Sequence, residues 1–249
     1  MFKRNRRSPG TVPVLFLHIQ KTAGTSIVNL ARQYYGESIS SHGEYWSKTR
    51  EQIKPIAFIS GHMGYHFAHP LMKGRFTFTF LRNPAERILS MYYFCRTRDP
   101  NEFEIYRLAH EMDLEHFLEA GLSDPCARMH IWNNQVWQLA HGYAPLDNRT
   151  VDDYSEVDLL YLAKQHLDEF SHVGFTETVE RDTRKILREL GIPQPAEVPV
   201  ENATSNRPTV DTIPDTARTR LDQLTWLDNQ LYEYAVKKFN PSPEPKTRE

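Results

Sequence analysis

A short loop of small and hydroxyl-bearing residues lies near the start of the chain, between an apolar run and a helical pattern. Residues 17–26 have the sequence LHIQKTAGTS. At a strand-to-helix turn the first amides of the helix converge, and the helix dipole adds partial positive charge. Lys21 adds a full charge, and the threonines and serine after it offer hydroxyl donors. The loop therefore predicts a binding place for a phosphate or sulfate group, formed by Lys21, Thr22, Ala23, Gly24, Thr25 and Ser26.

This loop is not a Walker A loop, because its lysine precedes its glycine. The Walker pattern needs a glycine, four residues and then Gly-Lys-Ser/Thr, whereas here Lys21 comes before Gly24. A P-loop kinase would also need an acidic Mg²⁺ ligand at the end of a strand, and the predicted strand ends offer Ser60 and Arg82 instead. The simpler alternative is a strand-to-helix connection that carries only surface polar residues.

A second candidate anion site lies at residues 80–93, with the sequence FLRNPAERILSMYY. Arg82 falls at the carboxyl end of a predicted strand, where ligands of α/β proteins usually bind. Ser90 lies about two turns into the following helix. A fixed guanidinium and a hydroxyl can together hold a second phosphate. The alternative is that Arg82 and Arg87 pair with surface carboxylates.

The elements that must position these side chains follow from the hydrophobic pattern. Apolar runs predict strands at 12–19, 56–60, 75–81 and 172–175. Helical spacing predicts helices at 24–35, 84–96, 103–120, 129–141, 157–170, 179–190 and 216–239. Asn83 and Pro84 have the types expected at a helix start, and Gly191 at a helix end. Met129, Trp132, Val136 and Leu139 form one apolar stripe, which predicts a core face.

This order of elements predicts an α/β fold, with a central, mostly parallel sheet flanked by helices in a single P-loop-like domain at 12–239. Residues 1–11, which are basic, and 240–249, which are rich in proline, are expected to be disordered tails.

A net charge of −2 gives no reason to expect nucleic acid as a partner. The run at 12–19 is too short to span a bilayer. With no signal peptide visible and two cysteines expected to be reduced, we expect a cytoplasmic protein without an integral membrane segment. Its oligomeric state stays open.

Together the two segments resemble the PAPS-dependent sulfotransferases, in particular the branch that contains heparan sulfate 2-O-sulfotransferase. KTAGTS at 21–26 is similar to that family's loop for the 5′-phosphosulfate, and RNP at 82–84 with Arg87, Ser90 and YYF at 92–94 is similar to its 3′-phosphate motif. Weaker similarity at 173–177, at the loop 202–208 and at 231–235 extends the resemblance over residues 15–239. Gln20 and Ala23 depart from the proline and glycine that family members often have, and we expect Ala23 to be tolerated there with a negative φ.

The resemblance implies that PAPS (3′-phosphoadenosine 5′-phosphosulfate) is the donor and PAP the product. Lys21 would reach the leaving oxygen, the loop at 21–26 would hold the phosphosulfate, and Arg82 with Ser90 would hold the 3′-phosphate. The polar loop at 202–208 is expected to fold over the adenosine, with Thr204, Ser205 or Arg207 touching the 3′-phosphate side; a plain surface loop is the alternative.

A histidine in a Gly-His context after the second strand serves as general base in that family, and the resemblance gives this role to His62. Glu44 and His66 are the reserve candidates. A zinc site from His62, His66 and His69 would lack the usual companion motif, so we expect no metal. The resemblance implies a hydroxyl acceptor on a carbohydrate or glycolipid. A P-loop nucleotide kinase and a non-catalytic nucleotide-binding protein are the alternative functions.

Overall fold

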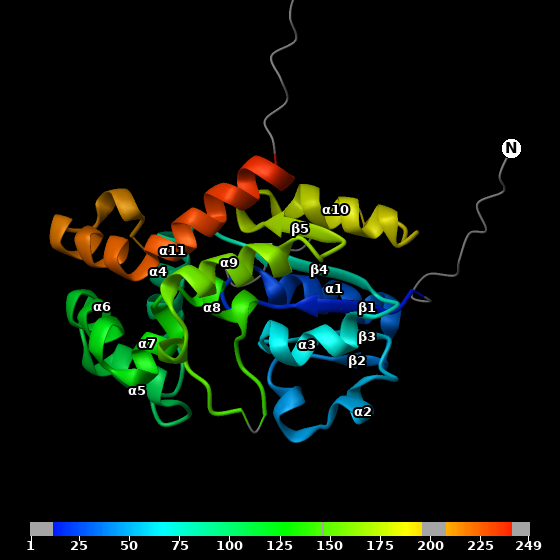
Figure 1. Cartoon of the computed structure of the whole chain (residues 1–249), viewed down its shortest axis with the longest axis horizontal. Helices are drawn as coiled ribbons and strands as arrows, with labels where there is room; N and C mark the ends of the chain where they lie inside the picture. The colour runs from blue at the N-terminus through cyan, green and yellow to red at the C-terminus, as the bar shows by residue number, and fades with distance from the viewer. Residues whose placement is uncertain (1–11, 146, 196–207, 241–249) are drawn as a thin grey trace, which may run out of the picture.

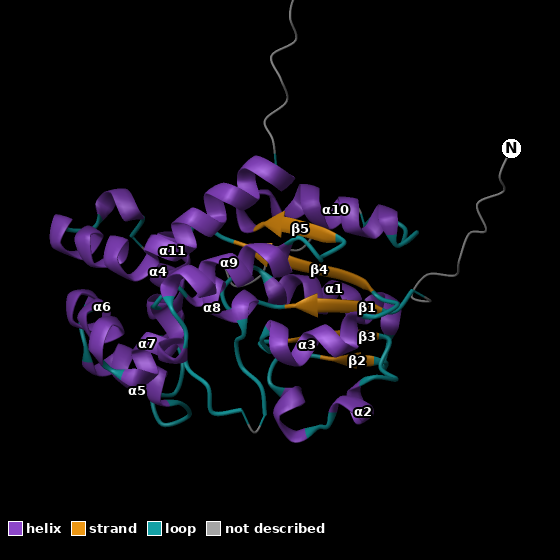
Figure 2. Cartoon of the chain, viewed as in Figure 1, coloured by secondary structure: helices purple, strands orange, loops and turns teal. Residues whose placement is uncertain are grey.

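The protein is built around a parallel sheet of five strands. The computed structural model describes residues 12–145, 147–195 and 208–240. The strand order is β2 (Ile39–Ser40), β3 (Phe58–Gly61), β1 (Val14–Leu17), β4 (Phe76–Leu81) and β5 (His172–Phe175), and every pairing is parallel (Figure 2). The four predicted strands are confirmed, and the sheet confirms the α/β prediction. Strand β2 is an addition, because two residues are too short for a periodic signal.

Helices cover both faces of the sheet and its carboxyl edge (Figure 1). In chain order they are α1 (Gly24–Tyr35), α2 (Arg50–Ile53), α3 (Tyr65–Met72), α4 (Pro84–Cys95), α5 (Glu104–Glu111), α6 (Leu114–Ser123), α7 (Pro125–Ile131), α8 (Asn134–Ala140), α9 (Glu156–Leu167), α10 (Val179–Glu189) and α11 (Asp215–Phe239). The arrowheads of the strands point toward the side of the molecule where α4–α7 lie. Ligands of parallel sheets bind at this edge.

The first strand shows how the sheet joins two cores. All four of its residues are fully buried. Val14 and Phe16 pack into a cluster with apolar side chains of α1 and α10, whereas Leu15 and Leu17 belong to the larger cluster on the other face. A strand covered on both faces has no polar positions, which is why residues 12–19 form a continuous apolar run.

Two predicted helices are each broken into two. The helix expected at 103–120 is interrupted at Asp113, whose carboxylate accepts a hydrogen bond from the amide of His116 and starts α6. The helix expected at 129–141 is interrupted at Asn133, which has φ 41°. The Oδ1 atom of Asn133 accepts hydrogen bonds from the amides of Leu227 and Asp228 at 2.8 and 3.0 Å. A contact with α11, distant in sequence, therefore decides this break.

Other expectations have mixed outcomes. The Asn83 side chain caps α4, as predicted, and Gly191 follows α10 with φ 70°. Helix α3 was not predicted, because Pro70 lies inside it and weakens its helical signal. In the apolar stripe, Trp132, Val136 and Leu139 are buried, but Met129 is exposed, so its assignment to the core was wrong. The expected tails, apart from Asn240, and all but the last residue of the loop at 202–208 lie outside the described residues.

Candidate active site

The loop after β1 has an unusual backbone, because two residues with side chains adopt positive φ. Lys21 has φ 69° and Ala23 has φ 66°, so the expectation of a negative φ at Ala23 was wrong. The left-handed conformation costs an L-residue about 1–2 kcal/mol, and glycine avoids this cost. The loop is therefore held in a tight form that turns the start of α1 toward the carboxyl edge of the sheet. Helix α1 has no side-chain cap and no acidic residue in its first turn, so its dipole is available to an anion.

Gly24 is required by a close approach rather than by its own φ. A Cβ atom at this position would lie 1.9 Å from Nε2 of His18. The imidazole of His18 therefore lies directly against the Cα atom of Gly24, and any larger residue would displace either the ring or the loop. His18 is itself buried and stacks on Phe16 at 5.1 Å between ring centroids.

Arg82 follows β4 and is held against the loop. Its Nη1 atom donates to the carbonyl of Lys21 at 3.1 Å. Its backbone is fixed from the other side by Gln135, which accepts from the Arg82 amide at 3.0 Å and donates to the Arg82 carbonyl at 2.9 Å. The two segments singled out in the sequence thus meet in space, and a buried glutamine from α8 sets the position of the arginine.

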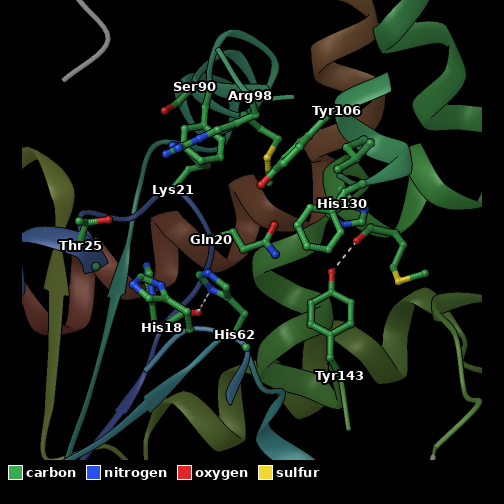
Figure 3. A pocket seen from close by; sticks show the side chains of 18 of the residues that line it. His18, Gln20, Lys21, Thr25, His62, Ser90, Arg98, Tyr106, His130 and Tyr143 are labelled. Atoms are coloured by element: carbon green, nitrogen blue, oxygen red, sulfur yellow. Dashed lines mark hydrogen bonds between the residues drawn. The ribbon is translucent and has the colours of Figure 1, made fainter. Parts of the chain in front are cut away.

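A cavity of about 980 Å³ lies at this edge, near the upper limit for small-molecule sites. Figure 3 shows Lys21, Thr25, Ser90 and His62 around it. Seven of the predicted site residues line the cavity: Lys21, Ala23, Gly24, Thr25, His62, Arg82 and Ser90.

The remaining predictions fare differently. Thr22 is buried and its hydroxyl donates to the Ile19 carbonyl at 2.8 Å, so its side chain stabilises the loop and does not line the cavity. Ser26 is also buried outside the lining. Ser205 and Arg207 lie outside the described residues. Arg87 does not pair with a surface carboxylate, because it is fully buried and donates to the His130 carbonyl at 3.0 Å.

Lys21 and Arg98 lie against the same aromatic ring. The Lys21 ammonium lies 3.6 Å from the centroid of Phe94, and the Arg98 guanidinium lies 4.5 Å from it. Burial lowers the pKa of Lys21 to about 8, and the nearby arginines act in the same direction. Three cations, Lys21, Arg82 and Arg98, therefore line one end of the cavity, which we call the donor end, and an anion there would relieve their mutual repulsion.

Three histidines gather at the ends of adjacent strands. His62 follows β3, His18 follows β1 and His42 follows β2, and one nitrogen of each lies within 4.8 Å of the others. The Nδ1 atom of His62 lies 3.0 Å from the His18 carbonyl. Because a carbonyl only accepts, Nδ1 bears the proton and Nε2 keeps its lone pair. Burial lowers the pKa of His62 to about 4, so the ring is neutral at pH 7.

Among the described residues, this trio could hold a transition metal, and it differs from the set of His62, His66 and His69 weighed from the sequence. His66 instead stacks on His141 at 4.7 Å and lies 3.8 Å from Asp147, while Glu44 pairs with Lys48. Neither reserve candidate is among the described residues that line the cavity. His62 is therefore the candidate that the cavity supports.

Sequence reasoning missed the supporting residues of this site. Gln138, fully buried on α8, donates to the carbonyls of His18 and Met63, both at 3.0 Å. No local pattern marks Gln135 or Gln138 as functional. His18 could have been found, because it follows a strand that must lie beside the strand before His62: the register pairs Leu17 with Gly61.

The fold and the cavity define an α/β protein with a large ligand site at the carboxyl edge of a parallel sheet. A model of the sulfotransferase family matches residues 9–235. Because the match covers most of the 249 residues, the chain belongs to the sulfotransferase family and is a transferase of sulfuryl groups. A comparison with curated proteins found no significant match. Among the described residues, no helix is long and apolar enough to cross a membrane.

Proposed function

We propose that the protein transfers the sulfuryl group of PAPS to a hydroxyl of a carbohydrate or glycolipid. One observation carries this proposal: the Lys21 loop, Arg82 with Ser90, and the neutral His62 all line the same cavity. The donor carries phosphate groups at both ends of its ribose and a sulfuryl group beyond one of them, so it needs two separate anion sites. The proposed branch, related to heparan sulfate 2-O-sulfotransferase, rests on the sequence motifs alone.

The residues present fit the donor. Lys21, the backbone at 23–25 and the Thr25 hydroxyl would hold the phosphosulfate at the start of α1, where the helix dipole favours an anion. Arg82 and Ser90 would hold the 3′-phosphate. The cavity of about 980 Å³ leaves room for an acceptor beside the nucleotide.

His62 supplies the base. Its Nε2 lone pair would accept the proton of the acceptor hydroxyl as the oxygen attacks sulfur. One S–O bond forms to the acceptor, and the S–O bond to the 5′-phosphate breaks. Lys21 would stabilise the charge that develops on the departing phosphate oxygen, because a cation that is partly removed from water acts more strongly on a neighbouring charge. Positioning and charge stabilisation would supply most of the rate, by analogy with phosphoryl transfer.

Ligand-dependent melting tests the donor. PAP at about 100 times its dissociation constant should stabilise the fold by about 2.7 kcal/mol, which corresponds to roughly 5–10 °C for a chain of this size. ATP with magnesium should not stabilise the fold. Arg82→Ala should weaken PAP binding by about 2–4 kcal/mol, whereas Arg220→Ala, on the surface of α11, should not. Stabilisation by ATP but not by PAP would favour the kinase; PAP binding without turnover on any acceptor would favour a non-catalytic binding protein.

A further inference from the structure

The end of the cavity away from the Lys21 loop has a different chemistry from the donor end. Its walls come from the loop after β2, the start of α5, helix α7 and Tyr143. Figure 3 shows Tyr106, His130 and Tyr143 across the cavity from Thr25, with Gln20 and His62 between them. We call this part the acceptor end, because a group bound there would lie beside the proposed base. It is formed by Tyr45, Trp46, Phe103, Tyr106, Met129 and Tyr143.

Exposed apolar side chains are concentrated at this end. Among the described residues, six large hydrophobic side chains are exposed, and three of them line this cavity: Trp46 is 53% exposed, Phe103 56% and Met129 39%. They come from three separate elements: the turn of residues 44–47, the residue before α5, and α7. Apolar side chains left in water around one cavity mark a surface that a ligand covers.

The charges at the acceptor end do not suit an anionic acceptor. The lining cations among the described residues are Lys21, Arg82 and Arg98, and Arg98 also lies close to the acceptor end: its guanidinium lies on Phe94, whose ring centroid is 6.1 Å from that of Tyr106. The lining carboxylates, Glu102 and Glu104, flank Phe103, and Glu104 pairs with Arg107.

The histidine at this end does not favour an anion either. The Nδ1 atom of His130 lies 2.8 Å from the Cys126 carbonyl, and burial lowers the pKa of His130, which opposes a positive charge on its ring. At the acceptor end a sulfated or uronate-containing polysaccharide would meet two carboxylates, one of them paired with Arg107, and Arg98 as the single nearby cation among the described lining residues, so a neutral sugar is favoured there.

We propose that the acceptor is an uncharged glycoside with an apolar aglycone, whose aglycone lies against Trp46, Phe103 and Met129 while its sugar hydroxyl faces His62. This inference rests on the proposed function. It selects, from the carbohydrate and glycolipid acceptors considered above, those that are amphipathic and neutral, and it rejects the polyanionic glycan that the heparan sulfate branch would suggest. An alkyl glycoside in solution and a glycolipid in a bilayer share this chemistry.

Matched acceptors test the proposal with the full chain and labelled PAPS. For each of several hexoses, the free sugar is compared with its octyl glycoside, and heparan sulfate serves as the polyanion. We expect kcat/KM to be at least tenfold higher for the octyl glycoside of one or more sugars than for the matching free sugar, and heparan sulfate to be the poorest acceptor. A neutral glycolipid in phosphatidylcholine vesicles is tested as a further acceptor. Turnover of this glycolipid would indicate an acceptor in a membrane, whereas turnover of the octyl glycosides alone would indicate a soluble one.

Variants locate the effect in the cavity. Trp46→Ala and Phe103→Ala should each raise KM for the octyl glycoside several-fold and leave PAP affinity unchanged. Tyr161→Ala removes an aromatic side chain that is 61% exposed on α9 and does not line the cavity, so it should change neither quantity. Preference for heparan sulfate, equal use of free sugar and octyl glycoside, or PAP binding with no turnover of any glycoside would each overturn the acceptor proposal. Absence of PAP binding to the wild-type protein would overturn the proposed function instead.

Discussion

At the scale of single residues, the site depends on two groups whose pKa values are lowered by burial, the proposed base His62 and the donor-end cation Lys21. His62 is directed by one hydrogen bond from its Nδ1 atom to the His18 carbonyl. Lys21 is held over Phe94 and is easier to deprotonate than an ordinary lysine. Both features make the proposed roles separable by experiment, because a base and a donor ligand affect different kinetic quantities.

His62→Ala should lower kcat by about 10²–10⁴, the usual contribution of a general base, while PAP affinity stays near that of the wild type. His66→Ala is the matched control, because His66 lies outside the cavity lining and stacks on His141. The measurement is kcat with a competent acceptor at saturating PAPS. Wild-type turnover in His62→Ala with a collapse in His66→Ala would move the base to His66.

The pKa of Lys21 predicts how donor binding depends on pH. With a pKa of about 8 in the free protein, Lys21 is protonated below pH 8 and loses its proton above it. A bound phosphate holds the proton and raises this pKa, so PAP affinity should be constant below pH 8 and fall by up to about tenfold per pH unit above it. Calorimetric titration from pH 6.5 to 9.5 measures this. The Lys21→Arg variant keeps its positive charge over this whole range, so its PAP affinity should depend less on pH. Identical pH profiles of PAP affinity for the wild type and this variant would contradict the assignment.

At the scale of elements, α8 positions both halves of the site. All seven of its residues are buried, although the helix carries three polar amides. Gln135 and Gln138 lie on one side of the helix, three residues apart. Gln135 fixes the backbone of Arg82, and Gln138 donates to the carbonyl that also orients His62. The helix thus connects the donor end to the base through hydrogen bonds rather than through direct contact with a ligand.

Gln138→Met keeps the volume of the side chain and removes its hydrogen bond to the His18 carbonyl. We expect kcat to fall roughly 10–100-fold, because small misplacements of a reacting group cost rate, with PAP affinity unchanged. Gln135→Met should show the opposite pattern, with weaker PAP binding through a displaced Arg82. Melting curves of both variants separate positioning from simple loss of fold. Equal losses of kcat and PAP affinity in the two variants would show a merely structural role.

At the scale of the whole molecule, α11 ties the last part of the chain to the site. Its Asp228 carboxylate accepts from the amides of Gln135 and Val136 at 3.3 and 2.8 Å, at the start of α8. Burial lowers the pKa of the fully buried Arg87, and the Asp228 carboxylate opposes this shift. In the opposite direction, the Oδ1 atom of Asn133, just before α8, accepts hydrogen bonds from the amides of Leu227 and Asp228 on α11. Removing this junction should therefore destabilise the fold and not only the site.

Asp228→Asn should lower the free energy of unfolding by about 1–3 kcal/mol, because it replaces one of the two oxygens that accept the amides of α8 by a donor and removes the negative charge near the buried Arg87. Asp222→Asn, exposed on the same helix, should change stability by less than about 0.5 kcal/mol. Urea denaturation followed by circular dichroism measures both. If the free energy of unfolding changed as little in Asp228→Asn as in the control, the contact between α11 and α8 would not stabilise the fold as proposed.

Local patterns were enough to predict four of the five strands, helix α1 with its boundaries, the cap at Asn83 and the loop at 21–26. These features depend on contacts close in sequence: a strand buried on both faces is apolar throughout, and an anion-binding turn needs small residues with a cation beside them. The same reasoning indicated Lys21, Arg82 and Ser90 as site residues, and the resemblance to the sulfotransferases indicated His62; all four line one cavity.

Tertiary contacts decided the rest. The helix break at Asn133 depends on the amides of α11, and the buried roles of Gln135 and Gln138 depend on strand ends that lie more than fifty residues away. Ala23 adopts a positive φ that its residue type disfavours, because the loop around it is fixed by Thr22 and Arg82. The gathering of His18, His42 and His62 follows from strand order, which places three separate chain segments at one edge of the sheet. A sequence pattern records the neighbours of a residue along the chain, whereas these side chains take their positions from partners that only the folded sheet brings near.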